Sequence, residues 1–190
     1  IPLRLVGSEM CIRDSCDALT DDELKIASLF SSSMTDIGLG KDSYEEIQKY
    51  QSSVTGGIST SFVMLPNDSN DDLKLALKIS GKSLEKNHLL MQELMLRTMS
   101  ESNFTESQRI KELLDFISSG NEKSVIQNGH ILAMSNAASQ LNGIASTNDL
   151  TSGIQFINNT SELSKGILEN RNLEKYIAVS YTHLTLPTKA

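Results

Sequence analysis

The chain has few side chains able to bind a metal ion or to act in acid–base catalysis, since its 190 residues contain three histidines and two cysteines. His88 stands three residues after Glu85 and five before Glu93, and neither spacing matches a zinc-binding pair. His130 ends the sequence Asn-Gly-His, which predicts a turn or an interruption of a helix. A role for His130 as a general base needs an acidic or nucleophilic partner that the sequence does not nominate. We therefore expect no catalytic, cofactor-binding or metal-binding residue in this chain.

The glycine pair Gly56–Gly57 does not predict a phosphate-binding loop, because neither a P-loop nor a dinucleotide-binding pattern surrounds it. A close approach of two backbones, or a bulge where a strand begins, accounts for both glycines.

Both ends of the chain match translations of one DNA element, the transposase mosaic end used in sequencing libraries. Its bases ATG TGT ATA AGA GAC encode the sequence of residues 10–14, Met-Cys-Ile-Arg-Asp. Its reverse complement, GTC TCT TAT ACA CAT, encodes the sequence of residues 179–183, Val-Ser-Tyr-Thr-His. The two copies face each other, as they do around a cloned insert. We therefore interpret residues 1–15 and 179–190 as adapter-derived.

This interpretation divides the chain into an adapter-derived segment (1–15), an insert (16–178) and a second adapter-derived segment (179–190). We expect the two end segments to pack against nothing specific. Cys11 and His183 then leave the set of candidate ligands, and Cys16, His88 and His130 remain. Because the reading frame is open through both adapters, we expect the insert to be an internal piece of a longer protein.

The composition argues against several classes of partner. The chain has 17 basic and 24 acidic residues, a net charge of −7, and no run of basic residues. An acidic chain of this kind is a poor ligand for nucleic acid or for an anionic membrane surface. No apolar run approaches the roughly eighteen residues of a transmembrane helix, and a single cysteine in the insert gives no evidence for an oxidising compartment.

Three hydroxyl residues carry the spacing of a capping box and predict helix starts. They are Thr20 with Glu23, Ser43 with Glu46, and Thr105 with Gln108. Apolar residues recur at helical spacing after Thr20 and Ser43, and again in 89–99, 109–117 and 131–141. The methionines of 89–99 are interpreted as core residues and not as the lining of a binding groove.

Between the second and third predicted helices the apolar period changes to two. Residues 58–65 and 73–80 alternate, and the second segment places leucines opposite lysines, as in a half-exposed strand. The polar segment 66–72 predicts the turn that joins them as antiparallel neighbours. The resulting order of elements predicts an α+β fold in which helices pack on one face of an antiparallel sheet.

The segment "MTDIGLGKDSYEEIQKYQSSVTGGISTSFVMLPND" (34–68) resembles the opening of the third domain in presequence protease-type peptidases, the C subfamily of the insulinase/pitrilysin superfamily. The segments "LALKISGKSLEKN" (75–87) and "GHILAMSNAASQLNGIASTNDLTSGIQFI" (129–157) are similar to later parts of the same domain. The resemblance covers essentially the whole insert, in order, and its Thr-Gly-Gly-strand is moderately specific.

The resemblance implies a parent protein with four homologous α+β domains that enclose a chamber for short unstructured peptides. It implies zinc in the parent, held by an H-x-x-E-H motif of the first domain and a distant glutamate. This chain contains no H-x-x-E-H, so no family site residue transfers to a position in it. The chain is then expected to be a non-catalytic, partial third domain that forms part of the chamber wall and itself binds no zinc.

The resemblance implies peptide substrates and other domains of the same chain as partners, while the acidic composition predicts no nucleic acid and no membrane as partners. It favours a bacterial cytoplasm or a mitochondrial-type organelle as the compartment. The alternative function is that of a non-catalytic scaffold or interaction protein with the same fold. Because only two strands are predicted, we also expect residues 16–178 alone to be helical but loosely packed.

Overall fold

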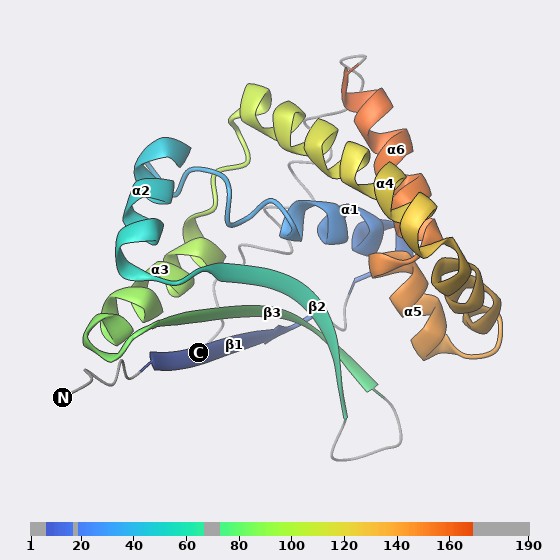
Figure 1. The fold of residues 1–190 in the computed structure, drawn as a ribbon, viewed down its shortest axis with the longest axis horizontal. Coiled ribbons are helices and arrows are strands. Elements are labelled where there is room, and N and C mark those ends of the chain that lie inside the picture. Colours follow the sequence, from blue (N-terminus) through green and yellow to red (C-terminus); the bar gives the residue numbers. More distant parts are fainter. Residues whose placement is uncertain (1–6, 17–18, 67–72, 169–190) are drawn as a thin grey trace.

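The computed structural model describes residues 7–16, 19–66 and 73–168 of the chain. The elements, in chain order, are β1 (Gly7–Ser15), α1 (Asp21–Ser31), α2 (Tyr44–Val54), β2 (Ile58–Pro66), β3 (Leu73–Leu84), the short 3₁₀ helix η1 (Glu85–Asn87), α3 (His88–Glu101), α4 (Ser107–Ser139), α5 (Gly143–Ser152) and α6 (Ile154–Leu168). Helix α1 contacts β2 and α3 contacts β3, whereas α4, α5 and α6 pack on one another (Figure 1). Because α5 and α6 also contact α1, these helices form a second layer over the one that covers the sheet.

The three strands form one antiparallel sheet in the order β1-β3-β2. In its register Ile12 lies opposite Ile79 on one side and Thr60 lies opposite Ile79 on the other. Ile79 is fully buried beneath the helices, whereas Lys78 is only partly buried. The predicted α+β fold, with helices on one face of an antiparallel sheet, is confirmed.

Strand β1 corrects two expectations, because residues 1–15 were expected to pack against nothing and only two strands were predicted. Residues Gly7–Ser15 pair with β3 along their whole length, and Met10 and Ile12 pack against a buried cluster. The physical reason is that the edge of β3 offers unpaired amides and carbonyls, which any extended segment with suitable alternation can satisfy. Residues 179–190 lie outside the described part of the chain.

Two of the three predicted capping boxes are confirmed. The hydroxyls of Thr20 and Ser43 each accept a hydrogen bond from the amide three residues later, and the glutamate side chain there accepts one from the cap amide. The third is wrong, because α4 begins at Ser107 and has no side-chain cap. The amide and hydroxyl of Thr105 donate instead to Asn103 Oδ1, at 3.0 and 2.6 Å.

The buried apolar side chains form two clusters. The first joins α1 to the start of α4, where the rings of Phe30 and Phe104 meet edge to face with centroids 5.5 Å apart. The second lies between β3 and α3 and contains Ile79, Met91 and Met95, all fully buried. The interpretation of the methionines as core residues is therefore confirmed.

Helix α4 joins two segments that the sequence predicts as separate helices. Asn128 has non-helical dihedral angles (φ −119°, ψ 17°) inside it, so the predicted interruption is present as a kink. None of the described helices combines the length and apolar character needed to span a membrane.

Candidate functional site

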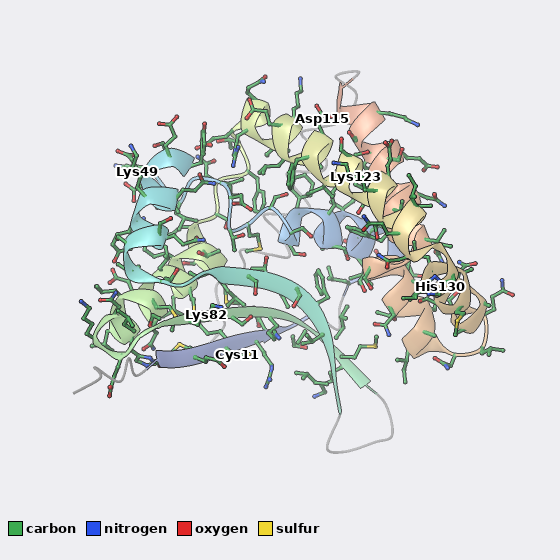
Figure 2. All side chains as sticks on the ribbon, viewed as in Figure 1. Cys11, Lys49, Lys82, Asp115, Lys123 and His130 are labelled. Atoms are coloured by element: carbon green, nitrogen blue, oxygen red, sulfur yellow. The ribbon has the colours of Figure 1, made fainter. Side chains whose placement is uncertain are left out.

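The structure keeps the three candidate ligands on different elements. His88 is the first residue of α3, His130 is an exposed residue of α4, and Cys16 is buried in the cluster formed around α1. Figure 2 shows His130 in the helical layer, far from the sheet. Within the described ranges, no three His, Cys, Asp or Glu side chains gather into a group that could hold a metal ion.

One polar pair was not anticipated from the sequence. Ser8 Oγ lies 2.6 Å from His88 Nδ1, although the two residues are eighty positions apart. A serine hydrogen-bonded to a histidine can act as a nucleophile with its general base. Catalysis by such a pair also needs a group that orients the histidine through its other ring nitrogen, and hydrogen-bond donors for the developing oxyanion. In the described part of the chain no acidic side chain bonds that ring nitrogen, so the pair is a link between β1 and α3.

The open face of the sheet carries a groove of about 640 Å³. Two cross-strand pairs run across it, Glu9 beside Lys82 and Arg13 beside Lys78. Its remaining lining residues are Met10, Cys11, Gly57, Ile58, Ser59, Ser80 and Gly81. Figure 2 labels Cys11 and Lys82 on neighbouring strands of this face. The groove therefore has three cationic side chains, those of Arg13, Lys78 and Lys82, and one carboxylate, that of Glu9. This excess of positive charge favours ligands that offer carbonyl oxygens or carboxylates.

The serines of this groove pair with one another. Ser59 Oγ and Ser80 Oγ lie 3.1 Å apart across β2 and β3. Since no histidine lies on this face of the described strands to act as a base, the pair suits binding better than nucleophilic attack.

The entry into β2 explains the Thr-Gly-Gly sequence. The amide of Gly56 donates to the carbonyl of Lys82 at 2.7 Å, and the amide of Lys82 donates to the carbonyl of Gly57 at 3.3 Å. Gly57 has a φ of 123°, which strongly favours glycine. The predicted close backbone approach is therefore confirmed, and it fixes the position of Lys82 in the groove.

A second depression of about 430 Å³ adjoins this turn, between the end of α2, the start of β1 and the end of β3. Val54, Gly56 and Leu84 line it together with Ser8. Asn87 closes one side and donates from Nδ2 to the carbonyl of Val54 at 3.2 Å. The depression has no charged group except Glu9 and Lys82, which it shares with the groove.

The clear pKa shifts belong to the scaffold. Hydrogen bonds from the backbone and the side chain of Ser43 lower the pKa of Glu46, which completes the capping box of α2. Hydrogen bonds to Asp42 and Glu101 raise the pKa of Arg97. Arg97 Nη2 lies 2.7 Å from Asp42 Oδ2, and Arg97 Nε lies 2.9 Å from Glu101 Oε2. Arg97 therefore links the loop before α2 to the end of α3.

Comparison with known proteins gives consistent matches. The family described as Peptidase M16C associated matches residues 11–163. The mitochondrial presequence protease of Saccharomyces cerevisiae is 29% identical over 139 residues, which cover 71% of this chain and 14% of that protein. The mitochondrial presequence protease of Mus musculus is 27% identical over 144 residues (75% and 14%), and that of Kluyveromyces lactis is 22% identical over 157 residues (82% and 16%).

The family match covers well over half of the chain, and it includes β2, β3, the last five residues of β1 and most of the helices. The matched relatives are several times longer, since the chain spans between 14% and 16% of them. The resemblance to presequence protease-type peptidases is thereby supported, and the chain belongs to the Peptidase M16C associated family.

Proposed function

We propose that this chain is a non-catalytic wall segment of a larger zinc metalloendopeptidase that degrades short unstructured peptides. The observation that carries the proposal is the family match over residues 11–163, together with relatives that are all named presequence proteases. In this proposal the open face of the sheet lines the peptide chamber, and other domains of the same polypeptide complete it.

The described residues do not fit a zinc site, because they present no group of three ligands. The proposal therefore assigns the metal and the H-x-x-E-H motif to the first domain of the parent, and no catalytic step to this chain. The contribution of the chain is to exclude bulk solvent from the chamber and to hold peptide near the wall.

The groove supports a role in holding peptide. Lys78 and Lys82 project from β3 into a shallow, open surface, where flexible ammonium groups can bond peptide carbonyls and carboxylates of many sequences. Such contacts are weak and unselective, as suits an enzyme that accepts many short peptides.

We further propose that residues 1–15 and 179–190 are translated adapter, so that the parent supplies a different sequence beside β3. Amplifying the parent gene across both junctions tests this directly. A genomic sequence that continues Glu9–Ser15 or Val179–His183 in frame overturns the assignment. The compartment proposed for the parent is that named in its relatives, the mitochondrion, or the cytoplasm of a bacterium.

The function is tested on the full-length parent. We expect H-x-x-E-H in its first domain and chelator-sensitive cleavage of a fluorogenic peptide. The double substitution Lys78→Glu/Lys82→Glu is expected to raise KM several-fold and to change kcat little. Lys49→Glu, on the exposed surface of α2, is the matched control and is expected to change neither.

Two results contradict the proposal. A complete parent without the H-x-x-E-H motif favours the alternative of a scaffold protein with this fold. Chelator-sensitive peptide cleavage by the 190-residue chain alone, lost on His130→Ala, shows instead that the chain itself is catalytic. We expect the purified chain to bind no stoichiometric zinc by metal analysis and to cleave no peptide.

A further inference from the structure

The second half of α4 and the start of α5 form an uncharged segment, Ser124–Asn148. It contains no Asp, Glu, Lys or Arg, although such residues make up 22% of the chain. Its only titratable side chain is His130, which Figure 2 shows on the helical layer. Exposed helices of soluble proteins carry charge on their solvated face, so a long exposed segment without charge is unusual.

The segment presents most of its large apolar side chains to solvent. Ile126 is 85% exposed, Met134 is 71% exposed and Leu141 is 82% exposed. Val125, Ile131 and Ile144 are exposed as well. Ala133 and Ala137 are exposed at helical spacing and add to the apolar character. Exposed apolar side chains therefore recur along α4 and into α5, and a surface rich in them marks an interaction site.

The inward side of the same segment is partly polar. Asn136 Nδ2 donates to Asp149 Oδ2 at 2.8 Å, and Asp149 is fully buried. The side-chain nitrogen Nδ2 of Asn121, one turn before the segment, is buried as well. The segment therefore directs some of its polar side chains at the neighbouring helices, while several of its large apolar side chains face outward.

We propose that the surface of Ser124–Asn148 packs against an apolar surface of another part of the parent polypeptide. The length of the relatives supports this occupant. Between 84% and 86% of their residues lie outside the match, so a parent of that length has other segments that can cover this surface. The exposed alanines favour a helical partner, because small side chains let two helices approach closely. The inference rests on the proposed function only in requiring a longer parent.

The chemistry of the segment argues against two other occupants. Two copies of this chain bring together two net charges of −7, which repel each other. An anionic membrane surface needs lysine or arginine beside the apolar groups, and the segment has none.

Hydrogen exchange tests the proposal by comparing the 190-residue chain with the full-length parent. We expect the amides of Ser124–Asn148 to exchange at least tenfold more slowly in the parent. We also expect the double substitution Ile126→Glu/Met134→Glu to remove that protection in the parent. In the 190-residue chain the same double substitution should leave the melting temperature unchanged, because both side chains are exposed there.

Leu89→Glu is the matched control, since Leu89 is 74% exposed on α3, outside the uncharged segment, and is expected to leave the protection intact. Equal exchange of the segment in the two proteins overturns the proposal. A second outcome favours another copy of the chain as the occupant and also overturns the proposal. In that outcome the 190-residue chain dimerises, Ile126→Glu/Met134→Glu abolishes the dimer, and the segment is not protected from exchange in a monomeric parent. Because exchange is measured without substrate, loss of the proposed peptidase activity and loss of the interface remain distinguishable.

Discussion

Gly57 carries the chain from α2 into the sheet with a φ of 123°, and nothing lies within 4 Å of the position that a Cβ would take. The cost of Gly57→Ala is therefore one of backbone conformation alone, and we expect a loss of about 1–3 kcal/mol in the free energy of unfolding. Gly120 also has open space around its Cβ position but is helical, so Gly120→Ala should gain about 0.5–1 kcal/mol. Urea denaturation measures the free energy of unfolding of both variants. A change of the same sign for Gly57→Ala and Gly120→Ala contradicts this explanation.

The capping box of α2 predicts a dependence of stability on pH. Hydrogen bonds from Ser43 lower the pKa of Glu46 below its ordinary value of 4.5 in the folded protein. A carboxyl with a depressed folded pKa stabilises the protein above its unfolded pKa, and this contribution is lost as the pH falls through the folded value. We expect Glu46→Gln to melt at a lower temperature than the native chain at pH 7, and the difference to shrink below pH 4.5.

Glu45→Gln is the control for that experiment, because Glu45 lies in the same first turn but takes no part in the box. It removes the favourable interaction with the helix dipole and leaves the Ser43 hydrogen bonds in place. Two results contradict the role of Glu46 in the capping box. One is a loss of melting temperature for Glu46→Gln that is no larger than the loss for Glu45→Gln. The other is a loss for Glu46→Gln that grows as the pH falls.

At the level of elements, Asp149 joins three helices. Its Oδ2 accepts from Asn136 of α4 and its Oδ1 accepts from the amide of Ile154 at the start of α6, each at 2.8 Å, while the residue itself belongs to α5. Asp149→Ala leaves two inward-facing donors without their acceptor, and we expect a loss of about 1–3 kcal/mol.

The loss should be local to the helical layer. Hydrogen exchange is expected to rise most in α5 and α6 and to change least in β3, whose contacts with these two helices are few. Asn148→Ala, at the exposed neighbouring position, is the control. Uniform destabilisation of the sheet together with the helices argues that the two layers unfold as one unit.

At the level of the whole molecule, the sheet depends on residues that we propose to be adapter-derived. Strand β1 covers one edge of β3, and Met10 and Ile12 pack against the second core cluster. Of the described strands, residues 16–178 keep only β2 and β3, and a two-stranded ribbon is marginal in water and exposes that edge. We expect this segment to associate and to melt without a sharp calorimetric transition.

The control for that prediction is residues 1–178, which retain β1. We expect it to melt more cooperatively and at a higher temperature than residues 16–178. If the shorter segment melts as a cooperative monomer at the same temperature, the interpretation of β1 as a necessary strand is wrong.

Local chemistry in the sequence determined the elements. The capping boxes at Thr20 and Ser43 fold as predicted because both hydrogen bonds of each box lie within four residues. The alternation of residues 73–80 and the Gly56–Gly57 turn were also predictable, because period and backbone freedom are local properties. Thr105 failed as a cap because α4 begins at Ser107 with Glu106 at the cap position, and the spacing of Thr105 and Gln108 does not reveal that later start.

Only the tertiary structure decided which segments meet. The pairing of Gly7–Ser15 with β3, the link between Ser8 and His88, and the groove beside Lys78 all join residues more than sixty positions apart. Such contacts depend on which strand edge remains open once the helices have packed, and no local pattern encodes that. For the same reason the absence of charge from Ser124 to Asn148 was readable in the sequence, whereas the outward direction of Ile126 and Met134 was not. A helix turns its apolar side chains toward whichever surface is available, and in this chain the inward side of α4 is partly taken by Asn136 and the buried carboxylate of Asp149.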